Sequence, residues 1–150
     1  MQRRPLDFRD FDSVFTDLDR LQQNGYDKAG QWDLGLTCDH LNKVMRGSLE
    51  GFPFKGPWYF RMLLGPMFKG FLFKQRRMRE GFKAPSALIP SSPSDEKAAV
   101  STCKDLLKRV RDHQGDFYPN PFFGKLSAEE WRQLHLIHSA HHLSFLIPKA

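Results

Sequence analysis

Cysteine is scarce in this sequence, and other features that define specialised classes of protein are missing. The only two cysteines are Cys38 and Cys103, and we expect no secretory signal before them, because the arginines near the start are not followed by an apolar run. The two thiols could in principle pair, but reduced thiols in a cytoplasmic protein are the simpler expectation. No apolar run approaches the roughly 18 residues of a membrane-spanning helix, so we expect no transmembrane segment.

Internal repeats, low-complexity tracts and clear strand patterns are missing as well. The chain has 150 residues, of which 40% are hydrophobic and 27% charged, and this balance is typical of one globular domain spanning 1–150. Phe is common, at 14 residues, and can line a core or a pocket. The net charge is +6, with much of the basic excess between Lys69 and Arg79, so the surface is not evenly basic.

Apolar residues recur at helical spacing in four long segments, which predicts an all-α fold. The main helices are expected at about residues 8–23, 34–49, 94–113 and 127–147. Asn24-Gly25 should end the first of them. Asp33 and Ser94 are well placed to cap the second and the third, because a side-chain oxygen at that position accepts from free backbone N–H groups.

The last helix has the clearest start, because Ser127 and Glu130 have the spacing of a capping box. Between the second and third main helices, residues 57–79 predict a helical insertion that is interrupted at Gly65-Pro66. A long proline-rich loop follows the insertion, and loops of this length are often functional. The sequence therefore predicts a four-helix bundle with a helical insertion between its second and third main helices.

Four of the six histidines lie close together in the last helix, at His135, His138, His141 and His142. Helical residues four apart lie about 40° apart around the axis and about 6 Å apart along it, so His138 and His142 share a face. Two imidazoles in this arrangement can reach one transition-metal ion. A third ligand has to come from another helix, and His40 is the only other histidine within a predicted helix interior.

These histidines also have an ordinary structural explanation. A buried histidine such as His40 is often a hydrogen-bonded packing residue, and a pair four residues apart can lie on an exposed helix face. The last helix is strongly apolar, however, with Leu134, Ile137 and Leu143 beside the histidines. Several buried imidazoles without partners would be costly in free energy, and a bound metal ion would give them a function.

The same residues resemble a known superfamily. His40 in the second helix and His138-Ser139-Ala140-His141-His142 in the last are similar to the pattern of the DinB-like metal-binding four-helix bundles. More narrowly, the chain looks like one DinB-related domain family of unknown function. The segments that carry this likeness are Trp32-Asp33-Leu34-Gly35, Pro121-Phe122-Phe123-Gly124 and the stretch from Trp131 to Pro148, and the resemblance spans essentially the whole chain.

The resemblance implies a ligand set. Members of the superfamily bind a divalent metal with one histidine from the second helix and a His-x-x-x-His pair from the fourth. Carried over, the ligands are His40, His138 and His142, with water or substrate at the remaining positions. Imidazole ligation suits a divalent transition metal, with Zn or Ni favoured and Fe, Mn or Cu also compatible.

Three neutral imidazoles fit a catalytic metal better than a structural one, because coordination positions stay open. Such an ion lowers the pKa of a bound water or thiol. Relatives of this fold include transferases and isomerases that use a low-molecular-weight thiol. The resemblance therefore implies a metal-dependent thiol transferase, or a hydrolase, acting on a small molecule.

Other groups near the expected ligands are candidates for orienting them or carrying protons, namely His135, His141 and Asp39. Packing or solvent exposure is their ordinary role, and it is the favoured one for His141. His113 follows a predicted helix end, where a solvated cation is expected. No general base can be assigned from the sequence.

Two other functions remain open. A non-catalytic, metal-stabilised module that binds a small molecule would need the same ligands. The aromatic and basic residues of 57–79 are also compatible with binding to anionic lipid or nucleic acid. A Phe-rich insertion is more often buried on the bundle or at a homodimer interface, so we expect packing there and no nucleic-acid binding.

Overall fold

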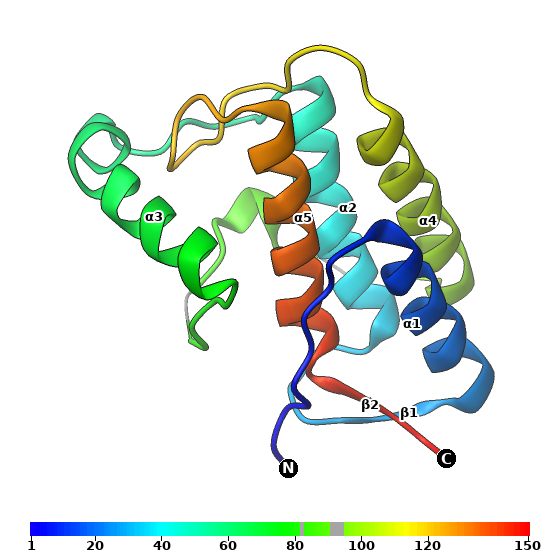
Figure 1. The fold of residues 1–150 in the computed structure, drawn as a ribbon. Helices are drawn as coiled ribbons and strands as arrows, with labels where there is room; N and C mark the ends of the chain where they lie inside the picture. The colour runs from blue at the N-terminus through cyan, green and yellow to red at the C-terminus, as the bar shows by residue number, and fades with distance from the viewer. Residues whose placement is uncertain (82, 91–94) are drawn as a thin grey trace.

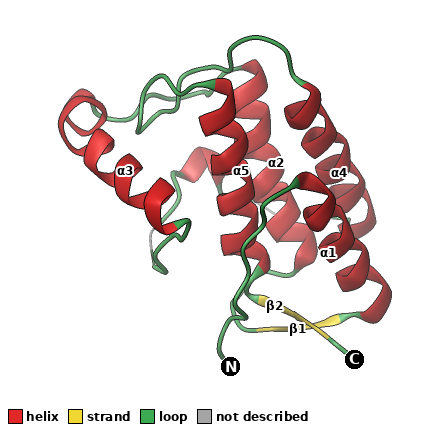
Figure 2. Ribbon diagram, in the orientation of Figure 1, coloured by secondary structure: helices red, strands yellow, loops and turns green. Residues whose placement is uncertain are grey.

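The computed structural model describes residues 1–81, 83–90 and 95–150, and this part of the chain is mostly helical with one small two-stranded sheet (Figures 1 and 2). Its α-helices are α1 (Phe11–Asn24), α2 (Leu34–Glu50), α3 (Gly65–Gln75), α4 (Glu96–Asp112) and α5 (Ala128–Leu143). Its strands are β1 (Tyr26–Lys28) and β2 (Leu146–Pro148). Helices α1, α2, α4 and α5 lie side by side, whereas α3 stands apart at one side of them (Figure 1).

The core lies between the four helices that lie side by side. Helix α1 contributes Val14, Leu18 and Leu21, which are completely buried because their spacing places them on one face. Helix α2 packs along α4 and also contacts α5. Cys38 of α2 and Cys103 of α4 are both buried free cysteines in this structure.

Helix α1 begins three residues later than predicted. The side chain of Asp10 accepts a hydrogen bond from the N–H of Ser13 at 2.7 Å, so Asp10 is the cap and Phe11 the first helical residue. Phe8 is still buried, but from the extended segment before the cap. Gly25 ends α1 as predicted, with a φ of 71° that few other residues adopt.

The other helix starts mostly follow the sequence. Asp33 caps α2 by accepting from the N–H of Leu36. Ser127 and Glu130 form the predicted capping box of α5. Ser94, the predicted cap of α4, lies outside the described residues, and the described cap is Asp95, whose side chain accepts from a backbone N–H of the first turn.

The interruption expected at Gly65-Pro66 is not observed. A π-helical turn, Phe60–Leu64, leads directly into α3, and Pro66 lies in the first turn of α3, where a missing N–H costs little. Gly65 is buried, and a Cβ there would lie 2.5 Å from the carbonyl oxygen of Phe122, so only glycine allows this close approach. The expected burial of 57–79 is met only in part, because many of its large apolar side chains are exposed.

Helix α5 ends at Leu143, four residues before its predicted end at Ile147. The chain then forms β2, which pairs antiparallel with β1, so that Tyr26 lies opposite Pro148 and Lys28 opposite Leu146. This strand pairing supplies backbone hydrogen bonds that a longer helix would have supplied. Neither strand was predicted from the sequence, because three residues are too few for an alternating pattern.

The N-terminal segment is fastened to the end of α5 by Arg4. Its guanidinium donates two hydrogen bonds to the carboxylate of Asp17, at 2.7 and 2.6 Å, and two more to the carbonyl oxygens of Leu143 and Leu146. Asp17 is a buried carboxylate of α1, so this bidentate pair connects α1, α5 and β2. Among the described residues, no helix has the length and apolar character needed to cross a membrane, which agrees with the sequence prediction.

Candidate metal centre

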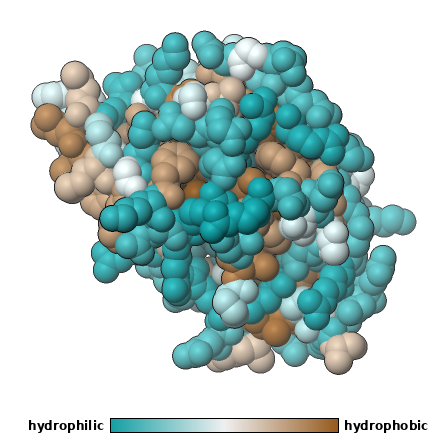
Figure 3. Space-filling model, in the orientation of Figure 1, coloured by the Kyte–Doolittle hydropathy of each residue, from teal (hydrophilic) through white to brown (hydrophobic). Residues whose placement is uncertain are grey.

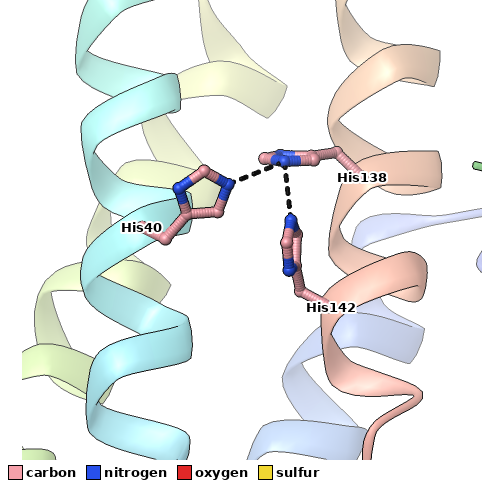
Figure 4. A group of neighbouring side chains, drawn as sticks. All are labelled: His40, His138 and His142. Carbon is pink, nitrogen blue, oxygen red and sulfur yellow. Dashed lines mark hydrogen bonds between the residues drawn. The ribbon is translucent and has the colours of Figure 1, made fainter. Parts of the chain in front are cut away.

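Three histidines converge between α2 and α5. His40 comes from α2, and His138 and His142 lie one turn apart on α5, as Figure 4 shows. The Nε2 of His138 lies 3.1 Å from the Nε2 of His40 and 3.1 Å from the Nε2 of His142. One ring nitrogen from each residue lies within 4.8 Å of the others, so a single ion can be reached by all three.

A hydrogen bond to the proline-rich loop fixes the orientation of the His40 ring. Its Nδ1 lies 2.7 Å from the carbonyl oxygen of Leu88, in a short 3-10 turn of that loop. A carbonyl only accepts, so Nδ1 must carry the proton and donate it. The Nε2 of neutral His40 then has a free lone pair that points at the other two rings. This arrangement is the usual one for a histidine that binds a metal, whose second nitrogen donates to a fixed acceptor.

The three imidazoles cannot satisfy one another by hydrogen bonding alone. If the Nε2 of His138 carries a proton, it can form a linear hydrogen bond with only one of its two neighbours. If it does not, its lone pair faces the lone pair of His40 at 3.1 Å. At least one of the two short contacts therefore lacks a good hydrogen bond while the rings are neutral. A cation between the nitrogens would accept all three lone pairs.

The rings are held neutral, which is the form that binds a metal. Burial lowers the pKa of His40, against the opposing effect of its hydrogen bond to Leu88. Burial, followed by repulsion from His142 and His40, lowers the pKa of His138 well below its usual value. The pKa of His142 is also far below its usual value, first because of burial and then because of His40 and His141. Near neutral pH all three nitrogens can donate to an ion.

Trp32 covers one side of the cluster and was not among the residues predicted for the site. Its ring stacks on His142, with centroids 5.6 Å apart and planes 19° apart, and its centroid lies 5.2 Å from that of His40. The sequence feature that could have revealed Trp32 is its position immediately before the cap Asp33, because a hydrophobic residue there often packs against the helix that follows. Trp32 and His142 are both half-buried, so the cluster approaches the surface on this side.

His135, which the sequence suggested as a group that orients the metal ligands or carries protons, has partners outside the three-histidine cluster. The Oγ of Ser48 donates to the carbonyl of Met45, so it accepts the hydrogen bond from the Nε2 of His135 at 2.8 Å. His135 also stacks on Trp131, and burial lowers its pKa to about 3. These contacts connect α2 to α5, and His135 is not one of the three clustered histidines.

His141 faces the N-terminal segment. A guanidinium N–H of Arg3 donates to its Nδ1 at 2.9 Å, and burial together with Arg3 lowers its pKa to about 4. Its ring centroid lies 4.8 Å from that of His142, so it can help to hold the ring of His142 in place. Asp39 follows Cys38 on α2 and is half-buried, and it is not one of the clustered groups either.

Neither of two surface hollows on the described part of the chain is lined by a histidine. One, of about 350 Å³, lies near Phe11, Arg111 and Leu136. The other, of about 410 Å³, lies along α1 near Ser13 and Arg20. The three-histidine cluster is therefore defined by its ligand geometry and not by either hollow.

The fold and the site together define a mostly helical protein with three histidines placed to hold a metal ion. The chain belongs to the family described as "Protein of unknown function (DUF1569)", whose model matches residues 1–149. No curated protein and no solved structure matches it.

Proposed function

We propose that the chain binds one divalent transition-metal ion through His40, His138 and His142, and that it is a DinB-like four-helix bundle with a helical insertion. The observation that carries the proposal is the convergence of three neutral ring nitrogens from two helices within 4.8 Å. The arrangement of α1, α2, α4 and α5 in Figure 1 is compatible with such a bundle, with α3 in the place of the insertion.

The donor set favours a borderline metal. The three donors are neutral imidazoles, without a thiolate or carboxylate in the cluster, which suits Zn or Ni best and Fe, Mn or Cu to a lesser degree. Three protein ligands leave at least one position for a water or another small molecule, as in catalytic zinc sites. His142 and Trp32 are the least buried parts of the cluster, so we expect access from the solvent on their side.

We further propose a metal-dependent transferase that uses a low-molecular-weight thiol, or a hydrolase, with a small-molecule substrate. An ion bound by neutral ligands keeps its full positive charge, and it would lower the pKa of a coordinated thiol or water. The contributions of the chain are to keep the three nitrogens deprotonated by burial, to fix the ring of His40 through Leu88, and to shield one side with Trp32.

A second candidate is a metal-stabilised module that binds a small molecule without transforming it. The position of the three histidines between α2 and α5 supports this alternative, because an ion held there would stabilise the packing of the two helices whether or not it does chemistry. Turnover of an electrophile with a low-molecular-weight thiol, present with the metal and lost after chelation, would separate the enzyme from the binding module.

Elemental analysis of the purified full chain tests the site itself. We expect about one transition-metal ion per chain, and losses of most of it in the separate variants His40→Ala, His138→Ala and His142→Ala. His113→Ala is the matched control, because His113 bonds to the carbonyl of Asp116 and lies outside the cluster. Full metal content in all three ligand variants would refute the assignment.

A further inference from the structure

The turn Phe60–Leu64, the residues before it and α3 expose an unusual number of large apolar side chains. These residues, called here the exposed apolar face, are Trp58, Tyr59, Met62, Leu63, Leu64, Met67, Phe68 and Phe71. In Figure 3 brown and tan atoms project from the molecule on the side where Figure 1 places α3. Single exposed apolar residues are common on proteins, but a contiguous group of this size indicates a binding surface.

The exposed apolar face is organised by the helix. Leu63, Met67 and Phe71 recur every four residues, so they form one stripe, and each is more than half exposed. Gly65 and Leu72 are the buried residues of the same helical segment, and they face the body of the protein. The segment therefore has two apolar sides, and only one of them packs against the rest of the described chain.

The stretch 51–79, which contains this helical segment, accounts for the whole net positive charge of the protein. Residues 51–79 contain seven of the 23 basic residues and none of the 17 acidic ones, so the rest of the chain has 16 basic and 17 acidic residues. Two of the seven are paired within the fold, Lys69 with Glu130 and Arg76 with Asp7. Four others are exposed and have no ion pair among the described residues: Lys55, Lys74, Arg77 and Arg79.

We propose that residues 55–79 dock the protein on an anionic lipid surface. The exposed aromatic and aliphatic side chains would enter the boundary between headgroups and acyl chains, while the unpaired cations contact anionic headgroups. The two features occur together on the one segment that stands away from the other helices (Figure 1). The docking is peripheral, and it is independent of the metal site.

The charge pattern favours a lipid surface over a second copy of the chain. A symmetric dimer brings the same patch from both subunits together, which would place two sets of unpaired cations against each other without acidic partners. The composition favours lipid over nucleic acid. Bases stack on aromatic rings, but Met62, Leu63 and Met67 are aliphatic and among the most exposed of the set.

Co-sedimentation of the full chain with vesicles tests the proposal. We expect binding to phosphatidylcholine vesicles that contain phosphatidylserine, little binding to pure phosphatidylcholine, and weakening as salt is raised. Trp58 is 64% exposed, so its fluorescence should shift to shorter wavelength on binding, and Trp58→Phe should remove most of that shift.

Two triple variants, one of charged and one of apolar residues, separate the two contributions to vesicle binding. The first replaces charged residues. Lys74→Gln, Arg77→Gln and Arg79→Gln together should weaken binding by about 100-fold. The matched control is Lys97→Gln, Lys108→Gln and Arg109→Gln, which removes the same charge from the exposed side of α4 and should weaken binding far less.

The apolar variant Leu63→Gln, Met67→Gln and Phe71→Gln should abolish the fluorescence shift. Its substitutions are at exposed positions, so unchanged circular dichroism and thermal unfolding should show that it folds.

Three outcomes would overturn the proposal. Equal binding of the wild type and both variants to anionic vesicles would show that the segment is not responsible. Binding to DNA or RNA without binding to vesicles would identify a nucleic-acid surface. A concentration-dependent dimer that is lost in the apolar variant, again without vesicle binding, would identify a protein interface.

Discussion

The Nε2 atoms of His40 and His138 lie 3.1 Å apart, although 98 residues separate the two histidines in the sequence. With His142 they form a group of neutral rings whose lone pairs converge, and two of the three rings are buried. Such a group costs free energy in a metal-free protein, because desolvated nitrogens are not fully hydrogen-bonded. A bound metal ion would turn the same geometry into a stabilising one.

Added Zn²⁺ or Ni²⁺ should therefore raise the Tm of the metal-free protein. At a free metal concentration 100 times the Kd, the gain in unfolding free energy is about 2.7 kcal/mol, which corresponds to a Tm increase on the order of 5–10 °C. Thermal unfolding with and without metal measures this increase.

The variant His138→Leu tests the same prediction, because its effect on the free energy of unfolding should differ between the metal-free and the metal-loaded protein. It removes the contact that cannot be satisfied, so the metal-free variant should be at least as stable as the metal-free wild type. With metal present it should be less stable, because it gains nothing from the ion. A His138→Leu protein that is stabilised by metal as strongly as the wild type would contradict the role of this histidine.

Trp32 should report on the bound ion. Its ring lies 5.6 Å from that of His142 and 5.2 Å from that of His40, so a paramagnetic ion such as Ni²⁺ or Cu²⁺ at the centre should quench its fluorescence. The measurement is the fraction of tryptophan emission that is lost on adding the ion. Trp32→Phe should remove most of this quenching, whereas Trp58→Phe should leave it. Equal quenching in the wild type and Trp32→Phe would indicate that the ion binds elsewhere.

The stability of the metal-free protein should fall as the pH is lowered, in part because of His135. Its pKa in the folded protein is about 3, against 6.5 for an unperturbed histidine. Between these values the unfolded chain binds a proton that the folded chain does not, so acidification favours unfolding, and stability is fully restored above the unfolded pKa. Each pH unit in this window can contribute about 1.4 kcal/mol per proton.

Denaturant unfolding of the metal-free wild type and His135→Gln at pH values between 6.5 and 4 would measure this contribution. The variant should show a shallower dependence on pH, by up to one proton per molecule. Glutamine can still donate to the Oγ of Ser48, so part of the native contact is kept. An identical pH dependence in the two proteins would mean that His135 is not held neutral by burial.

Two aspartates of α1 should differ sharply in their effect on stability. Asp17 is buried and bidentate with Arg4, so Asp17→Asn leaves a largely buried guanidinium without its counter-charge and should cost about 3 kcal/mol. Asp19 forms an exposed pair with Lys104, and Asp19→Asn should cost no more than about 0.5 kcal/mol. Chemical denaturation measures both, and equal costs would contradict the anchoring role of Arg4.

Helix type and most helix starts could be predicted from the sequence, because capping and apolar spacing are local properties. The capping box of Ser127 and the cap Asp33 need only a side chain and the backbone of the next turn. The end of α5 could not be predicted in this way. Whether residues 144–147 continue the helix or form a strand depends on pairing with β1, which lies more than 100 residues earlier in the chain.

The exposure of the apolar face could not be predicted from the sequence either. The sequence shows a Phe-rich and basic segment, and burial against the bundle is the ordinary expectation for it. The burial of Leu72 and the exposure of Phe71 follow from how α3 sits against its neighbours, which no local pattern specifies.

For the candidate site, the sequence by itself determined that His138 and His142 share a helix face, because four residues are close to one helical turn. It also supplied His40 as the third histidine through the resemblance to a metal-binding pattern. Only the tertiary structure decided that α2 and α5 pack with these rings together, that Leu88 fixes the proton of His40, and that Trp32 covers the group. These contacts join residues far apart in the chain, and their geometry depends on how whole helices pack.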